Sequence, residues 1–139
     1  MAELKDIMFF YEAMSSITGV NFDINEFNAK FKSILKDKSS IQMVVEVEGK
    51  AVGCLLAQVR QQMSDQYSFV EIQELYIAPK FRKYKAADFL YTTFEEKFVS
   101  KKHKQLRVNC NVNSTLNQNF YVKKGFKIFK KQYKKELFI

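Results

Sequence analysis

The segment from Tyr67 to Val112 constrains the fold more than any other part of the chain, because its apolar periodicity changes twice. The stretch YSFVEIQELYIAP is rich in β-forming residues and ends at Pro79, the only proline of the sequence. From Ala86 to Val99 the apolar residues recur at helical spacing, and Leu106 to Val112 alternates as a strand again. This order predicts a right-handed βαβ unit whose helix begins just beyond Pro79.

The first strand of this unit contains a break in its alternation. The apolar residues of one face change from a spacing of two to a spacing of three, in the order Val70, Ile72, Leu75 and Ile77. One extra residue near Gln73 or Glu74 restores the register, which is the pattern of a β-bulge. The opposite face would then carry Glu71, Tyr76 and one or both of Gln73 and Glu74. A fully buried strand with an irregular pattern is the alternative interpretation.

The remaining segments predict further helices and strands. They are a helix over Lys5–Ile17, a helix over Asn25–Lys36, a hairpin of strands over Met43–Val47 and Ala51–Val59, a helix over Thr115–Lys124, and one or two strands within Phe126–Phe138. A chain of 139 residues with 47% apolar content is long enough for one domain, spanning 1–139, and short for two.

Composition narrows the class of protein. Lys and Arg number 23 against 15 Asp and Glu, so the net charge of +8 favours anionic partners such as nucleotides, nucleic acid or phosphorylated cofactors. Cys54 and Cys110 lie in apolar runs, where a free cysteine behaves as a small hydrophobic residue.

No apolar run reaches the roughly 18 residues of a membrane span, and the N-terminus does not resemble a secretory signal. We therefore expect a cytoplasmic protein, with no membrane partner. His103 is the only histidine, which disfavours a metal site.

The connection from Lys80 to Ala87 is basic and contains no glycine. A helix N-terminus presents unpaired N–H groups and a positive dipole end, which together attract anions. Small Ala86 and Ala87 leave room for close approach, and the connection carries four cations, Lys80, Arg82, Lys83 and Lys85. From the residues alone, a solvated helix cap is at least as good an interpretation as a phosphate site.

Two motifs in this order resemble the GCN5-related N-acetyltransferase (GNAT) superfamily: ELYIAPKFRKYKAADFL and, downstream, NQNFYVKKGFKIF. The resemblance extends from about Ile41 to the C-terminus. In that family a loop of the form Q/R-x-x-G-x-G/A holds the cofactor pyrophosphate, and it falls here on Arg82, Lys83, Tyr84, Lys85, Ala86 and Ala87. Lys85 replaces the glycine of the fourth position. FYVKKGF matches the family's F-Y-x-x-x-G-F at the end of its last helix.

The resemblance implies an α/β (α+β) fold of three layers. Its central sheet would be mixed and mostly antiparallel, with one bulged strand, and the βαβ unit would bind acetyl-CoA. The family's first strand is not evident in this chain. The sheet edge at that end would therefore be bare, covered, or paired with a second subunit in a homodimer.

The resemblance also implies an activity, the transfer of the acetyl group of acetyl-CoA to a primary amine by direct attack in a ternary complex. The acceptor would be a small molecule or a protein or peptide. The reaction needs a proton acceptor, stabilisation of the thioester oxyanion, and a proton donor for the departing thiolate. Glu71 and Glu74 are the acceptor candidates, and for each the alternative is a surface carboxylate paired with a lysine. Backbone N–H groups around Tyr76 and Ile77 would hold the oxyanion.

Tyr121, within FYVKKGF, is the candidate proton donor, because the matching tyrosine of the family commonly faces the cofactor sulfur. Its alternative is an aromatic side chain that packs beside Phe120. Asn113 or Ser114 matches the family's polar contact to the pantetheine arm.

Two further hypotheses stay open beside the enzyme. The first is a non-catalytic acyl-CoA-binding or regulatory module of the same fold, which the glycine-free loop makes credible. The second is a role in binding tRNA or other nucleic acid, which rests on the net charge alone and is less favoured.

Overall fold

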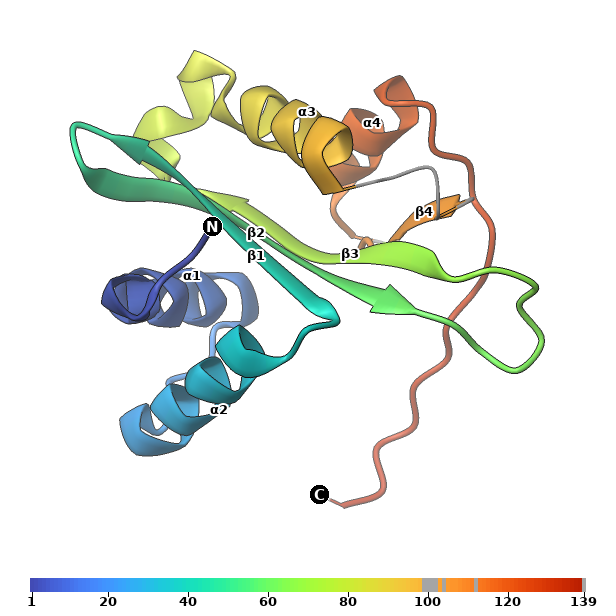
Figure 1. The fold of residues 1–139 in the computed structure, drawn as a ribbon, viewed down its shortest axis with the longest axis horizontal. Helices are drawn as coiled ribbons and strands as arrows, with labels where there is room; N and C mark the ends of the chain where they lie inside the picture. Colours follow the sequence, from blue (N-terminus) through green and yellow to red (C-terminus); the bar gives the residue numbers. More distant parts are fainter. Residues whose placement is uncertain (99–102, 104, 112, 139) are drawn as a thin grey trace. The chain divides into compact units, whose positions relative to one another are not determined.

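A computed structural model describes residues 1–98, 103, 105–111 and 113–138 of the chain (Figure 1). Its contacts divide the chain into two compact units, Met1–Asn109 and Cys110–Ile139. The first unit contains the sheet with α-helices on both of its faces.

The first unit is built on a sheet with the strand order β1-β2-β3-β4. Its strands are β1 (Ser40–Val47), β2 (Lys50–Arg60), β3 (Phe69–Ile77) and β4 (Gln105–Val108). The pairs β1–β2 and β2–β3 are antiparallel, whereas β3 and β4 are parallel. This arrangement confirms the mixed, mostly antiparallel sheet and the βαβ unit. β4 is shorter than predicted, since it ends at Val108, and Val112 lies outside the described residues.

The bulge predicted in β3 is present. Leu56 and Ala57 are consecutive in β2, but their partners in β3 are Glu74 and Ile72, so Gln73 is the extra residue. The bulge keeps Ile72 and Ile77 on one face of the sheet and turns Glu74 to the other face.

Two helices cover the face that carries Glu74: α1 (Ile7–Thr18), which follows a short 3-10 turn at Leu4–Asp6, and α2 (Ile24–Lys36) (Figure 1). Gly19 ends α1 in the left-handed region, with a φ of 72°. The side chain of Asp23 caps α2 by accepting a hydrogen bond of 2.9 Å from the backbone N–H of Glu26. The core between these helices and the sheet contains Phe10, Ala13, Phe27, Phe31 and Cys54.

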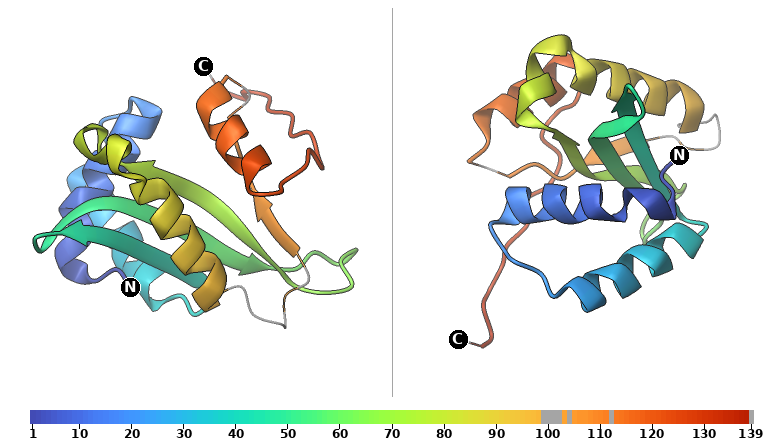
Figure 2. Two further views of the ribbon diagram at one scale, coloured as in Figure 1. Left: turned by 90° about the horizontal axis from the view of Figure 1, so that it is seen from above. Right: turned by 90° about the vertical axis from the view of Figure 1, so that its left-hand side faces the viewer.

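A third helix, α3 (Ala86–Phe98), covers the opposite face of the sheet (Figure 2). It buries Leu90, Tyr91 and Phe94, and an apolar side chain such as Leu90 or Phe94 contributes about 1.5–3 kcal/mol through the removal of its surface from water. The unit therefore has three layers, as expected. Val99, the predicted end of this helix, lies outside the described residues.

β1 forms one edge of the sheet, where the resemblance would have placed a further strand. The chain begins with the short turn and α1, without a preceding strand among the described residues. The backbone N–H of Ala2 donates a hydrogen bond of 2.9 Å to the carbonyl oxygen of Gln42 in β1. Within the described part, this contact at Ala2 covers a small portion of the edge.

The second unit contains α4 (Thr115–Lys123), followed by Gly125 with a φ of 95°. The helix confirms the prediction for this region. The prediction of one or two terminal strands within Phe126–Phe138 is wrong for the described residues, which form no strand there. A strand is stable only beside a partner strand, and the described part of this unit provides none.

Candidate active site

The outer edge of β3 opens at the bulge. The pairing of β3 with β4 ends at Ile72 and Val108, with a last hydrogen bond of 3.3 Å from the N–H of Asn109 to the carbonyl oxygen of Ile72. Among the described residues, β3 has no strand partner on this side from Gln73 onward. A parallel pair that separates in this way leaves backbone groups available to a ligand.

The direction of these backbone groups follows from strand geometry. The N–H of Ala78 donates a hydrogen bond of 2.8 Å to the carbonyl oxygen of Val52 in β2. Because N–H groups alternate between the two sides of a strand, Ile77 directs its N–H to the open edge, whereas Tyr76 directs its own toward β2. Of the two residues predicted to supply the oxyanion donor, Ile77 therefore has the suitable orientation.

Glu74 lies half-buried on the sheet face below α1 and α2, directly opposite Leu56 of β2. Burial raises the pKa of its carboxyl above the ordinary value. In the described part of the chain, no hydrogen bond or ion pair reaches this carboxylate. A carboxylate with a raised pKa and an open proton-accepting position is suited to general base chemistry.

Glu71, the other candidate base, is engaged in an ion pair. Its Oε1 lies 3.0 Å from the guanidinium of Arg60, and 13% of the Glu71 side chain is exposed. Next to it, the amide of Gln73 donates to the amide oxygen of Gln58 at 3.2 Å. An ion pair to arginine occupies the carboxylate, so Glu74 is the better placed of the two acids.

The predicted phosphate loop keeps the backbone shape that a glycine would normally provide. A 3-10 turn, η2 (Pro79–Tyr84), is followed by Lys85 with φ 55° and ψ 28°, and α3 begins at Ala86. Left-handed conformations cost a non-glycine residue roughly 1–2 kcal/mol. The backbone at Lys85 therefore has a conformation that glycine would adopt without this cost.

The side chains of this loop differ in their surroundings. Lys83 and Lys85 are exposed, and Ala86 and Ala87 are partly buried in the first turn of α3, where N–H groups have no intrahelical acceptor. The side chain of Tyr84 lies outside the described residues. Arg82 is anchored to the strand, as its Nε donates to the carbonyl oxygen of Ile77 at 2.9 Å and its guanidinium lies 5.7 Å from the centre of the Tyr76 ring.

The remaining predicted site residues belong to the second unit. Tyr121 is buried in α4, with its ring edge-on to Phe120 at 5.3 Å and to Phe126 at 5.4 Å. Ser114 stands at the N-cap of α4, and its carbonyl oxygen accepts the N–H of Gln118 at 3.1 Å. The N–H of Asn113 is bonded to the side chain of Asn111 at 2.8 Å. The structure thus groups the candidate bases, Tyr76, Ile77 and the loop in one unit, and Asn113, Ser114 and Tyr121 in the other.

Cys54 lies beside Glu74 in the first unit and is fully buried. Burial, together with the nearby carboxylate of Glu74, raises the pKa of its thiol to about 12. Such a thiol stays protonated at neutral pH, and it therefore lacks the thiolate that a covalent acyl-enzyme would require.

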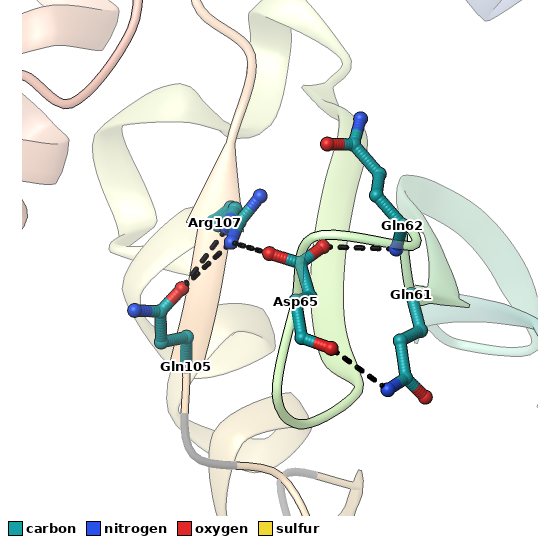
Figure 3. A network of polar contacts seen from close by, with 5 residues as sticks. All are labelled: Gln61, Gln62, Asp65, Gln105 and Arg107. Carbon is teal, nitrogen blue, oxygen red and sulfur yellow. Dashed lines mark hydrogen bonds and ion pairs between the residues drawn. The ribbon is translucent and has the colours of Figure 1, made fainter.

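A polar network at the far end of the same sheet face was not predicted from the sequence (Figure 3). Arg107 of β4 lies 3.1 Å from Asp65 in the β2–β3 loop, and its guanidinium lies 3.6 Å from the centre of the Phe69 ring. Gln105 accepts from the same guanidinium at 2.9 Å, and Asp65 also accepts the backbone N–H of Gln62. This network fixes the loop to β4. Its members are far apart in sequence and follow no local pattern, so only the fold identifies it.

Two other structural observations bear on the class of protein. Among the residues that the structure describes, no helix combines the length and the apolar content that a membrane crossing needs. Within the same ranges, no group of three His, Cys, Asp or Glu side chains is arranged to hold a metal ion.

Solved structures share this fold at low sequence identity. A transcriptional regulator from Bacillus halodurans C-125 matches with a TM-score of 0.86 and 16% identity, covering 98% of this chain and 96% of its own. Aminoglycoside N-acetyltransferase AAC(6')-Iy in complex with CoA matches with a TM-score of 0.83 and 14% identity, covering 97% and 90%. Ribosomal-protein-alanine N-acetyltransferase from Brucella melitensis biovar Abortus 2308 matches with a TM-score of 0.78 and 14% identity, covering 98% and 96%.

No curated protein matches the sequence. The model of the acetyltransferase (GNAT) family matches residues 7–126, which include the bulged strand, the loop and FYVKKGF. The chain therefore belongs to the GNAT acetyltransferase family.

Proposed function

We propose that this protein is an acetyl-CoA-dependent N-acetyltransferase that acts on a primary amine by direct attack in a ternary complex. The observation that carries the proposal is the position of Glu74, next to the bulge at Gln73, with a raised pKa and without a partner in the described part. The same bulge begins the open edge of β3, so a proton acceptor and free backbone donors occur together.

Glu74 would accept a proton from the attacking amine, directly or through one water molecule. The amine nitrogen then bonds to the acetyl carbon, and the N–H of Ile77 donates to the oxygen that gains negative charge. As the carbon–sulfur bond breaks, Tyr121 would supply a proton to the departing thiolate, which leaves as a free thiol, and the nitrogen would return its surplus proton to the Tyr121 phenolate to give the neutral amide. Cys54 takes no part in this scheme, because its thiol remains protonated.

The loop before α3 fits the pyrophosphate of acetyl-CoA. Lys85, in the left-handed region, directly precedes the first turn of α3, and the N–H groups of that turn, with the exposed Lys83 and Lys85, would provide an anion site. Acetyl-CoA supplies the activated acetyl group. Asn113 or Ser114 would contact its pantetheine arm, and the proposal treats 1–139 as a single domain.

The proposal is tested by measuring acetyl-CoA binding by calorimetry and free thiol release in parallel, with and without a panel of primary amines. We expect saturable binding and thiol release that depends on the amine, with an N-acetylated product of matching mass. Binding without amine-dependent release would indicate a non-catalytic module instead. Binding of nucleic acid that weakens steeply with salt and needs no acetyl-CoA would favour the nucleic-acid hypothesis.

A further inference from the structure

An apolar pocket opens between α1 and α2 on the sheet face that carries Glu74. Its volume is about 190 Å³. Its walls include Phe10, Phe22, Phe27 and Phe31, and Leu56 of β2 forms part of its floor. An engineered cavity of about 150 Å³ with a similar lining binds benzene, so this pocket has room for one ring or one branched aliphatic group.

The walls of this pocket are held in place by contacts among the aromatic side chains. The hydroxyl of Tyr11 donates to the carbonyl oxygen of Phe22 at 2.7 Å, and its ring lies edge-on to Phe27 at 5.2 Å. The rings of Phe10 and Phe31 lie 4.9 Å apart. A pocket with such walls is largely formed before a ligand arrives, which is typical of small-molecule sites.

The register of the sheet connects this pocket to the candidate base. Leu56 pairs directly with Glu74 across the β2–β3 ladder, so the two side chains project from the same face. The Cβ atoms of such a pair lie about 4.5–5.5 Å apart. A ligand with an apolar group on Leu56 therefore needs a linker of only a few bonds to bring an amine to Glu74.

We infer that the acceptor is a small primary amine that carries one compact apolar group, such as a phenyl ring, on a short linker. This inference rests on the proposed function and assigns a substrate class to its acceptor site. The apolar group occupies the pocket between α1 and α2. The amine, cationic in solution, is attracted by the Glu74 carboxylate and loses its proton there.

The charges around the pocket disfavour polycationic acceptors. Lys30 of α2 is exposed and lines the pocket, where it repels a second or third ammonium group. Glu71, a further acid on the same face, is paired with Arg60. The site thus provides one open carboxylate for one amine, and aromatic walls for the rest of the molecule.

The test compares 2-phenylethylamine with ethylamine, which lacks the ring, and with spermidine and kanamycin, which are polycations. Thiol release is measured at saturating acetyl-CoA, and amine binding is measured separately by calorimetry with CoA present. We expect kcat/KM for 2-phenylethylamine to exceed that for each other amine by about tenfold or more.

Two matched variants test whether the preference for 2-phenylethylamine depends on this pocket. Thr18→Phe places a ring at the pocket, because Thr18 is an exposed lining residue at the end of α1. Thr92→Phe makes the same change at an exposed position of α3 on the other face of the sheet. We expect Thr18→Phe to remove the preference for 2-phenylethylamine and Thr92→Phe to keep it. Thermal unfolding of both variants shows whether either change disturbs the fold.

The outcomes separate this inference from the proposed function. Faster turnover of spermidine or kanamycin, or equal turnover of ethylamine and 2-phenylethylamine, would overturn the inference and leave the acetyltransferase intact. If no amine releases thiol although acetyl-CoA binds, the proposed function fails. The inference is then decided by binding alone: saturable binding of 2-phenylethylamine that Thr18→Phe weakens supports the pocket, and the lack of such binding overturns it.

Discussion

The Nε atom of Arg82 donates a hydrogen bond of 2.9 Å to the carbonyl oxygen of Ile77, the last residue of β3. The contact joins the loop before α3 to the strand end that carries the proposed oxyanion donor. A side chain in the loop thus fixes the backbone of the strand.

We expect Arg82→Ala to lower the affinity for acetyl-CoA by about tenfold and stability by about 1 kcal/mol, because the variant loses this hydrogen bond and a cation. Lys83→Ala is the matched control, since Lys83 is an exposed neighbour with charge but without this anchor. Calorimetry and chemical denaturation measure the two effects. Equal losses of affinity and stability in both variants would show that the hydrogen bond from Arg82 to Ile77 contributes nothing beyond the charge of the side chain.

Lys85→Gly should stabilise the protein by about 1 kcal/mol relative to Lys85→Ala, because Lys85 has a φ of 55° and glycine adopts this conformation without a steric cost. Both variants lose the same charge, so their difference reports the backbone alone. The midpoint of denaturation compares them. A stability of Lys85→Gly at or below that of Lys85→Ala would contradict the left-handed geometry of the loop.

Some of this fold follows from local sequence and some does not. The bulge at Gln73 was predictable, because a spacing that changes from two to three within one strand requires an extra residue if the same face is to stay apolar. The terminal strands within Phe126–Phe138 were predicted wrongly, since alternation of lysines and aromatics also suits a segment without strand partners. Strand formation depends on a neighbouring strand, which local periodicity does not report.

In the candidate site, too, the sequence predicted the positions of residues but not the contacts between them. The loop motif indicated the position of Arg82 but not its contact with Ile77. The pairing of Glu71 with Arg60 depends on the register of β2 and β3, so sequence alone left Glu71 and Glu74 equivalent. The Arg60 ion pair distinguishes them, because it occupies Glu71, whereas no such contact reaches Glu74 in the described part of the chain and burial raises the pKa of its carboxyl.

Glu74→Gln should lower kcat by about 10²–10⁴-fold, the usual contribution of a general base. The wild type should show an acid limb in its kcat–pH profile, with an apparent pKa above the ordinary 4.5, because burial raises the pKa of this carboxyl. The variant should lack that limb. Glu71→Gln serves as control and should keep it. If the acid limb of the kcat–pH profile persists in Glu74→Gln, another group is the proton acceptor.

The difference in stability between the wild type and Glu74→Gln should depend on pH. Because the folded state holds the Glu74 proton more tightly than the unfolded chain does, wild-type stability falls as pH rises from 4.5 through the raised folded value. Glu74→Gln removes this loss. It should therefore be more stable than the wild type near pH 7, with the difference vanishing below about pH 4. Denaturation at a series of pH values measures this, and a difference independent of pH would argue against the raised pKa.

Tyr121→Phe should lower kcat by about 10²-fold or more while leaving acetyl-CoA affinity unchanged, since it removes a proton donor and keeps the ring contacts with Phe120 and Phe126. Stopped-flow thiol release and calorimetry separate the two quantities. If kcat is unaffected, Tyr121 is a packing residue only.

The central claim is direct transfer of an acetyl group to an amine, and a single-turnover experiment with isotopically labelled acetyl-CoA tests it most directly. Protein and labelled acetyl-CoA are mixed in equal amounts, a panel of primary amines is added, and mass spectrometry follows the label. We predict that the label moves from acetyl-CoA to the amine with one equivalent of free thiol and without labelled protein at any time. Acetyl-CoA that stays intact with every amine, or label that binds covalently to the protein before the amine is added, would contradict the account.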